Sequence, residues 1–351
     1  MKSEKLLHAI GTIDDGLIFA ARPAEKKKTP RTRIVWTAAA AAVLALILAI
    51  GVGAAGDFES LENLFGPAFP GARQSSLDPE LIARLGAPVG VSVTDNGVAV
   101  TVDSVVRDRY NCTLVLTVEK SDIDGKGFLF DRSTLKVSGA EFTGPAASSS
   151  DSVSGDGKAR YVVSWMGDES VIPGGKATVV LENLVINSHG VLTEQTLPGR
   201  WELEFDMGYA DQSADLPTGQ TLSVEGAEIT VNQVTISPLS IRVISTAKLT
   251  EADMEAVLDH NGKSVLRERL EWPDIVILKK DGTRIANRAM RDPQQGGDSH
   301  IQNGWGNSEQ KGGVLECQCS LVFDQPVLLE DLESVSIEGV EIPLNGLEAV
   351  Q

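Results

Sequence analysis

The histidines of this chain, the first candidates for acid–base or metal chemistry, stand far apart. They are His8, His189, His260 and His300. None belongs to an HxH, HExxH or nucleophile-elbow pattern, and the sequence has no phosphate-binding glycine motif. We therefore expect no catalytic residue, no cofactor and a non-enzymatic protein. An unrecognised hydrolase that uses one of the outer histidines is the alternative from the enzyme class.

One acidic segment, Asp122-Ile-Asp124-Gly125, resembles part of a calcium-binding loop. The twelfth position counted from Asp122 is Ser133, where such a loop needs a bidentate Glu. We interpret the segment as a turn.

The three cysteines, Cys112, Cys317 and Cys319, each lie in a run of alternating apolar and polar residues. A free cysteine behaves as a small apolar residue, so this alternation predicts thiols buried in a core. A metal site at Cys317 and Cys319 is the alternative, but two thiolates without further ligands do not complete a tetrahedral site. The sequence predicts no metal site.

A long uncharged run between Arg33 and Asp57 predicts a transmembrane helix over residues 34–56. At about 1.5 Å per residue, this run crosses a hydrocarbon core of roughly 30 Å. Basic residues precede the run and acidic residues follow it, so the N-terminus is expected in the cytoplasm and the rest of this single-pass protein outside the cell membrane. A cleavable secretory signal is the alternative, although its charged N-terminal region would be unusually long.

The predicted cytoplasmic part, residues 1–33, combines an amphipathic head with a basic tether. Apolar residues recur at helical spacing in the head. They are Leu6, Leu7, Ile10, Ile13, Leu17 and Ile18. A helix this short needs a surface to pack on. Either the face lies on the lipid bilayer or it docks into a groove of a cytoplasmic partner.

Charge is distributed unevenly along the chain, which has a formal net charge of −18. Residues 1–33 carry eight Lys or Arg against four Asp or Glu, so the remaining residues carry all of the acidic excess. A basic head suits anionic inner-leaflet lipids. The acidic bulk argues against direct binding of nucleic acid, which requires a basic surface.

The part after the membrane segment is predicted to be mainly β. Residues 57–88 are expected to form a juxtamembrane linker, and from Val89 onward the apolar pattern has a period of two. Asn96-Gly97 between two alternating runs is a strong signal for a hairpin. Further strands are predicted at residues 112–119, 134–137, 161–165, 177–186 and 201–205. About seven strands suggest a β-sandwich.

The pattern then recurs at an offset of 129 residues, which places Gly97 over Gly226 and Cys112 over Ile241 without a gap. We interpret this as a tandem repeat, with one β-sandwich domain at residues 89–215 and a second at 216–351. The second copy is expected to contain strands at residues 274–280, 314–323 and 332–342, with a turn at Asp281-Gly282. It also contains a predicted helix over residues 250–259, where Thr250 and Asp253 fit a capping box.

Two long polar stretches, residues 144–158 and 291–313, are predicted to be loops. The second contains Trp305 between two glycines. This tryptophan is either a candidate outer contact for a partner or a side chain that folds back onto the edge of the sandwich.

Three segments together resemble a bacterial family of membrane-anchored, anti-sigma-factor-like proteins with an extracellular domain of unknown function. The segments read LLHAIGTIDDGLIFAA, VTDNGVAVTVDSVVRDRYNCTLVLTVE and EGAEITVNQVTISPLSIRV. The resemblance implies that the head binds an extracytoplasmic-function sigma factor, while immunoglobulin-like outer domains sense or bind an unknown ligand at the cell envelope. The head positions that match are Leu6, Leu7, Ile10, Ile13, Asp14, Asp15, Leu17 and Ile18.

The sequence therefore predicts an envelope signalling protein whose head is the effector and whose β domains are the sensor. The alternative is a surface-anchored structural or adhesive protein whose head only anchors it. The two differ in whether Ile10 and Ile13 are needed for a cytoplasmic interaction.

Overall fold

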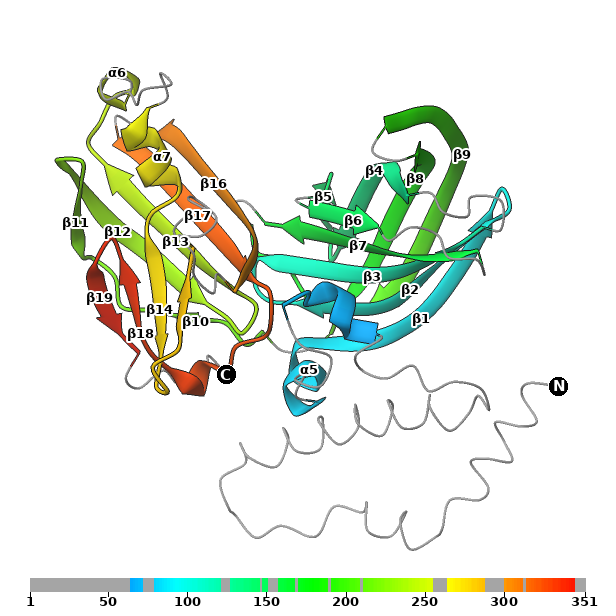
Figure 1. Ribbon diagram of the computed structural model, residues 1–351, viewed down its shortest axis with the longest axis horizontal. Coiled ribbons are helices and arrows are strands. Elements are labelled where there is room, and N and C mark those ends of the chain that lie inside the picture. The colour runs from blue at the N-terminus through cyan, green and yellow to red at the C-terminus, as the bar shows by residue number, and fades with distance from the viewer. Residues whose placement is uncertain are drawn as a thin grey trace, which may run out of the picture. The chain divides into compact units, whose positions relative to one another are not determined.

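The computed structural model in Figure 1 is mainly β, as predicted. It describes residues 64–71, 79–120, 127–145, 147–150, 157–167, 170–188, 191–208, 211–254, 264–287, 300–311 and 314–344. All of these belong to one compact unit, Val43–Gln351. The predicted head, tether and transmembrane segment lie outside the described residues. Within the described residues, no helix is long and apolar enough to cross a membrane.

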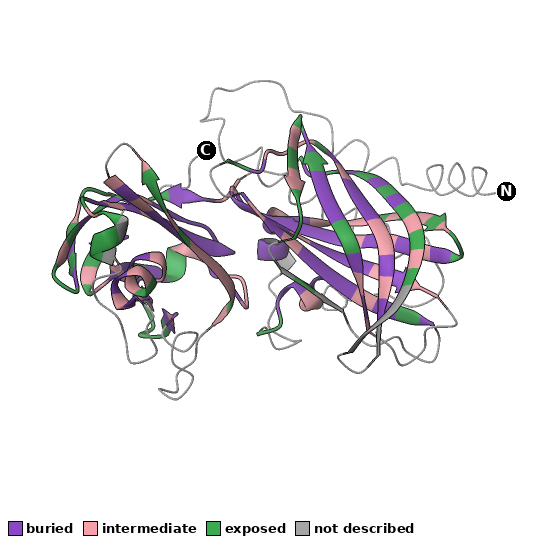
Figure 2. Ribbon diagram, turned by 90° about the horizontal axis from the view of Figure 1, so that it is seen from above, coloured by how far each residue is buried: buried purple, intermediate pink, exposed green. Residues whose placement is uncertain are grey.

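Residues 86–206 form the first β unit, in which two antiparallel sheets enclose one core. The first sheet has the order β1 (Gly86–Asp95), β2 (Val98–Arg107), β3 (Asn111–Glu119), β7 (Lys158–Met166) and β6 (Ala147–Ser150). The second sheet has the order β5 (Ala140–Thr143), β4 (Gly127–Val137), β8 (Lys176–Ser188) and β9 (Val191–Asp206). Along the strands buried and exposed positions alternate (Figure 2), because successive side chains point to opposite faces.

Residues 214–343 form the second β unit. Its larger sheet has the order β11 (Thr221–Val224), β12 (Ala227–Ile236), β13 (Ser240–Ala247), β17 (Val314–Phe323) and β16 (Ile301–Lys311), and β10 (Ala214–Asp215) also pairs with β12. Its smaller sheet has the order β15 (Arg284–Ala286), β14 (Ile275–Lys279), β18 (Leu332–Ile337) and β19 (Val340–Pro343). Two helices, α6 (Glu251–Met254) and α7 (Val265–Glu271), and a 3-10 turn (Leu329–Asp331) complete it.

The two β units share one strand order. β1-β2-β3-β7-β6 corresponds to β11-β12-β13-β17-β16, and β5-β4-β8-β9 corresponds to β15-β14-β18-β19. The bounds of β12 equal those of β2 shifted by 129 residues, and β13 starts 129 residues after β3. Even the irregularities agree, since the β2–β3 register shifts between Val102 and Ser104 and the β12–β13 register between Val231 and Gln233. The offset read from the sequence therefore describes the backbone of both hairpins.

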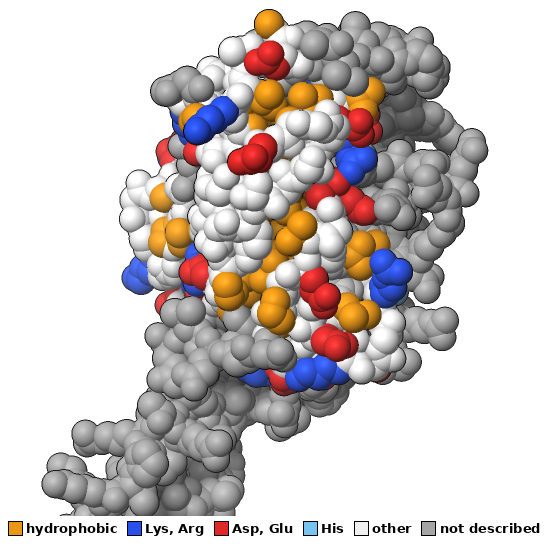
Figure 3. Space-filling view, turned by 90° about the vertical axis from the view of Figure 1, so that its left-hand side faces the viewer, with side chains coloured by type: hydrophobic (Ala, Val, Ile, Leu, Met, Phe, Trp, Pro, Cys, Tyr) orange, Lys and Arg blue, Asp and Glu red, His pale blue; other side chains and the backbone are white. Residues whose placement is uncertain are grey.

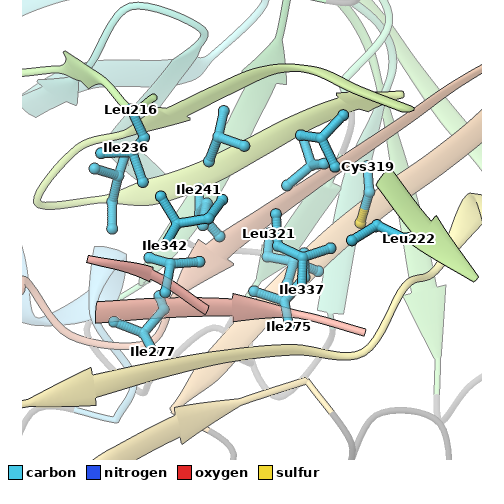
Figure 4. Close-up of a cluster of buried hydrophobic side chains, with 14 of the residues drawn as sticks. Leu216, Leu222, Ile236, Ile241, Ile275, Ile277, Cys319, Leu321, Ile337 and Ile342 are labelled. Carbon is cyan, nitrogen blue, oxygen red and sulfur yellow. The ribbon is translucent and has the colours of Figure 1, made fainter. Parts of the chain in front are cut away.

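Each β unit has its own hydrophobic core. In the first, an aromatic group of Phe128, Phe130, Tyr161 and Trp201 packs with ring centroids 5.2 to 6.2 Å apart. In the second, Ile241 and Leu321 from the larger sheet point toward Ile277 and Ile342 from the smaller one (Figure 4). The predicted burial of the cysteines is confirmed, because Cys112, Cys317 and Cys319 are free thiols within these cores.

The capping box predicted at Thr250 is confirmed. The Asp253 Oδ2 atom accepts hydrogen bonds from the Thr250 backbone N–H at 2.7 Å and from the Thr250 hydroxyl at 2.8 Å, and the Asp253 N–H donates to Thr250 Oγ1 at 3.2 Å. The helix is described only over Glu251–Met254, so the rest of its predicted length lies outside the described residues.

Three secondary-structure predictions were wrong. Residues 147–150, within the predicted loop 144–158, form the edge strand β6. Residues 332–342 are not one strand but a hairpin of β18 and β19, because Glu338 and Gly339 both have positive φ and reverse the chain. Residues 301–311 are not a loop but the edge strand β16. This strand lacks an alternating apolar pattern because two of its positions have room only for glycine. A Cβ at Gly304 would lie 2.8 Å from the Trp272 ring, and one at Gly306 would lie 2.3 Å from the Glu271 carbonyl oxygen.

Candidate functional site at the junction of the two β units

The structure does not bring the predicted site residues together. The head positions Leu6 to Ile18 lie outside the described residues, as do Asp122 and Asp124 of the acidic segment. Trp305 is half-buried in β16, directly opposite Ser320 of β17. Among the described residues no group of three or more His, Cys, Asp or Glu side chains is placed to hold a metal ion.

The surface of the second β unit offers no large apolar patch on the face drawn in Figure 3. Apolar side chains occur there in small groups with Asp and Glu between them (Figure 3). Among the described residues, Val171 is the large apolar side chain that is clearly exposed, at 49%. Within the described residues, polar and apolar contacts gather at the junction of the two β units.

A four-residue turn between β2 and β3 presents a buried carboxylate. The Asp108 N–H donates to the Asn111 carbonyl at 3.0 Å, which closes the turn. Asp108 Oδ1 accepts from the N–H groups of Tyr110 at 2.8 Å and Asn111 at 2.7 Å. Asp108 is 2% exposed, so these bonds replace the water that its charge would otherwise need.

The corresponding turn of the second β unit is built in the same way. The Ser237 N–H donates to the Ser240 carbonyl at 2.8 Å. Ser237 Oγ accepts from the N–H groups of Leu239 at 3.0 Å and Ser240 at 2.9 Å. The Ser237 hydroxyl accepts the same two backbone hydrogen bonds that the Asp108 carboxylate accepts in the first turn, as expected for related Asx and ST turns.

The two turns bind each other. Ser237 Oγ and Ser240 Oγ both donate to Asp108 Oδ2, at 2.6 and 2.5 Å. Asn111 Nδ2 donates to Ser240 Oγ at 2.8 Å. Charge-assisted bonds of this kind are roughly twice as strong as neutral ones, so this buried cluster is a strong polar link between the β units.

Arg109 adds a second link on the wetter side of the junction. Its guanidinium binds Asp211 at 2.8 Å and Asp215 at 2.9 Å. Burial opposes the charge of Arg109, but hydrogen bonds and the charges of both carboxylates outweigh it and raise the pKa of the guanidinium. Asp215 also accepts from Thr235 Oγ1 at 2.7 Å, which ties the ion pair to β12.

Tyr110 reaches across the junction. The guanidinium carbon of Arg242 lies 4.0 Å from the centroid of its ring, a cation–π arrangement. Gln233 Nε2 donates to its hydroxyl at 3.2 Å. The first turn therefore contributes an aromatic side chain to the outer face of the β12–β13 sheet.

An apolar segment docks at the same junction. We call it the stem: residues 64–71, with a 3-10 turn at Gly66–Ala68, and the helix α5 (Pro79–Leu85). Phe65, Phe69, Ile82 and Leu85 are at most 3% exposed. They pack in one cluster with Val106 and Val115 of the first β unit and Leu239 of the second. Part of the predicted juxtamembrane linker is thus packed onto both β units.

Hydrogen bonds to its backbone hold the stem on both β units. Ser104 Oγ donates to the Leu64 carbonyl at 2.5 Å, on the first β unit. The Gly71 N–H donates to the Asp324 carbonyl at 3.0 Å, on the second. A Cβ at Gly71 would lie 2.0 Å from Asp324 Oδ2, so glycine lets the stem approach this closely.

The sequence contains one signal for the stem contact that periodicity overlooked. Leu114, Val115 and Leu116 are consecutive apolar residues in β3, all 0% exposed. Leu114 and Leu116 face the core, and Val115 therefore faces outward. An apolar residue at an outward position predicts that something covers that face of the sheet, and the stem is what covers it.

Comparison with known proteins assigns a family model to part of the chain. Residues 28–120 match a domain of unknown function, DUF4179. The match begins in the predicted basic tether and ends just after β3, so it includes the stem and the Asp108 turn. No curated protein matches. A solved structure, titled the crystal structure of the conserved domain protein from Bacillus anthracis, shares 13% identity over 71% of this chain and 75% of that chain, with a TM-score of 0.44.

Proposed function

We propose that the protein is a non-enzymatic, single-pass envelope signalling protein of the anti-sigma-factor-like kind. In this proposal the cytoplasmic head binds a sigma factor through Leu6, Leu7, Ile10, Ile13, Asp14, Asp15, Leu17 and Ile18. The two β units are immunoglobulin-like sandwiches outside the membrane that bind a ligand of the cell envelope.

The docking of the stem carries this proposal. Leu64 follows the predicted membrane segment by only a few residues, and the stem then packs onto both β units instead of hanging between them and the bilayer. A ligand that alters the contact of the β units therefore also alters the surface on which the stem rests. That coupling is what a sensor needs, and an adhesive protein on a tether has no use for it.

The family match supports the same division of labour. The DUF4179 match joins the tether, the apolar segment, the stem and the first three strands in one unit. A recurring unit of this composition fits a module in which the membrane segment and the junction act together.

The test is a pull-down from native membranes with the full-length protein and with a variant carrying Ile10→Asp and Ile13→Asp. These charges would stand on the apolar face of the head, so the proposal expects a sigma factor to co-purify only with the unaltered protein. A matched control carries Thr12→Asp and Thr29→Asp, which add the same two charges to the head and tether without altering that face.

A sigma factor recovered equally with both charge variants would overturn the assignment of the apolar face. Membrane insertion with no head-dependent partner at all would favour the alternative, a surface-anchored structural or adhesive protein.

A further inference from the structure

We infer that the two β units meet across a local two-fold axis, and that a carboxylate on one side only selects the pairing of a first unit with a second. The recognition element is the pair of turns at residues 108–111 and 237–240. This inference concerns how the β units recognise each other, and it does not depend on the proposed signalling role.

Corresponding residues touch each other at the junction, which is the mark of a two-fold contact. Asp108 and Ser237 are 129 residues apart and hydrogen-bond at 2.6 Å. Asn111 and Ser240 are also 129 residues apart and hydrogen-bond at 2.8 Å. Because 129 is the offset of the repeat, each turn binds the same turn of the other copy. An isologous contact uses one surface twice in this way.

The residues at the axis differ although their backbones agree. Position 108 is an aspartate and its counterpart at 237 is a serine, and both accept hydrogen bonds from the two N–H groups that follow in the turn. One carboxylate then receives two hydroxyl donors from the opposite turn. The junction therefore contains one carboxylate, that of Asp108, and two hydroxyl groups of the opposite turn donate hydrogen bonds to it.

This asymmetry discriminates between pairings. Two first units would place two buried carboxylates against each other at the axis, which like-charge repulsion and desolvation both oppose. Two second units would bring together hydroxyl groups with no charged acceptor. The unlike pair alone joins a charged acceptor with its donors, so the partner of each β unit is the other copy of the repeat.

The sides of the axis have diverged as well. Leu239 lies under the stem, while its counterpart Tyr110 lies against Arg242 and Gln233. One side of the junction is therefore apolar and occupied by the stem, and the other is polar and filled by side chains. Because the residues on the two sides of the axis differ, the contact that both copies still share is the pairing of the two turns.

The test exchanges the charge between the two copies in the full-length protein in detergent. Hydrogen exchange is measured at the Tyr110 and Asn111 amides and at the Leu239 and Ser240 amides. Ser237→Asp places a second carboxylate at the axis, and exchange protection at both turns should fall by about tenfold or more. Adding Asp108→Ser to this variant moves the carboxylate to the other copy, and protection should return to near the wild-type value.

Ser223→Asp, at an exposed position of β11, is the matched control and should leave both turns unchanged. If Ser237→Asp leaves the protection intact, the inference fails. If the double variant is no better protected than Ser237→Asp, the two positions are not equivalent and the inference also fails. Should Ser237→Asp prevent folding, recovery of the fold by Asp108→Ser decides the question in the same way.

Discussion

Burial determines the chemistry that the single residues of this protein can offer. Burial raises the pKa of the Cys112 thiol to about 12, and it raises that of Cys317 to about 12 as well. Cys319 is 1% exposed in the same core as Cys317. A thiol must ionise and be reached in order to react, so burial makes all three of them inert in the folded protein.

Alkylation tests this directly. At pH 8 the folded protein should take up no iodoacetamide during a labelling time that modifies a free thiol completely, and after denaturation it should take up three equivalents. Modification of a single thiol in the folded protein would show that one core strand opens. Mass spectrometry distinguishes these results and identifies the modified cysteine.

The buried carboxyl group of Asp324 gives a prediction about how stability depends on pH. Burial raises the pKa of its carboxyl group above the usual 3.8, and the nearby His300 lowers it by less. A raised pKa means that folding disfavours the ionised form of Asp324. The stability that the protonated carboxyl group allows is fully present below the unfolded-state pKa and is lost as the pH rises through the folded-state pKa. Asp324→Asn should therefore stabilise the protein more, relative to wild type, at pH 7 than at pH 3.

Asp281→Asn is the matched variant, because the pKa of Asp281 is lowered where that of Asp324 is raised. The Thr283 backbone N–H lowers the pKa of the Asp281 carboxyl, so its stabilisation is present above the unfolded-state pKa and is lost as the pH falls through the folded-state pKa. That variant should be less stable than wild type at pH 7 and should approach it at pH 3. Urea unfolding at both pH values checks the pair, and equal differences at the two pH values would contradict both assignments.

At the scale of secondary-structure elements, close backbone approaches account for what the sequence did not reveal. Most strands were predictable because one face is buried and the apolar residues alternate. β16 was not, since α7 and Trp272 take the space of side chains at Gly304 and Gly306 and leave no apolar period. The sequence predicts a linker where the stem lies, because the burial of the stem depends on Val106, Val115 and Leu239, which are distant in sequence. The junction escaped prediction for the same reason, since no local pattern shows that two turns meet.

The approach of α7 to β16 gives a prediction for Gly306→Ala. The added Cβ would lie 2.3 Å from the Glu271 carbonyl oxygen, and backbone cannot move aside as a side chain can. We expect a loss of about 1 to 3 kcal/mol in the free energy of unfolding. Gly66→Ala is the control, because no atom lies within 4 Å of its added Cβ. Urea denaturation of both variants checks this, and equal stability would mean that α7 shifts freely.

The stem gives a prediction for Ile82→Ala. Ile82 is 1% exposed, so its truncation should cost about 2 to 5 kcal/mol. Because the cavity would open at the junction, hydrogen exchange should also increase at the Leu239 and Ser240 amides. Ile186→Ala, which is equally buried in the core of the first β unit, should lower stability without that local increase. Unchanged exchange in Ile82→Ala would contradict a stem that holds the junction.

For the whole molecule, the buried thiols make the predicted topology easy to measure. Wild-type protein in intact cells should not react with a membrane-impermeant maleimide. Ser223→Cys, on the exposed side of β11, should be labelled from outside, whereas Thr29→Cys in the tether should be labelled only after permeabilisation. The opposite pattern would reverse the orientation, and labelling of both in intact cells would contradict a membrane crossing between them.

The position of the stem also decides how the molecule responds to mechanical load. Tension applied to the chain before Leu64 does not reach β1 directly, because the Ser104 bond to the Leu64 carbonyl and the Gly71 bond to the Asp324 carbonyl come first. Both must break, and the apolar contacts of Phe65 and Phe69 must peel away, before α5 and then β1 are pulled. We therefore expect the stem to detach first under such a load, before either β unit unfolds.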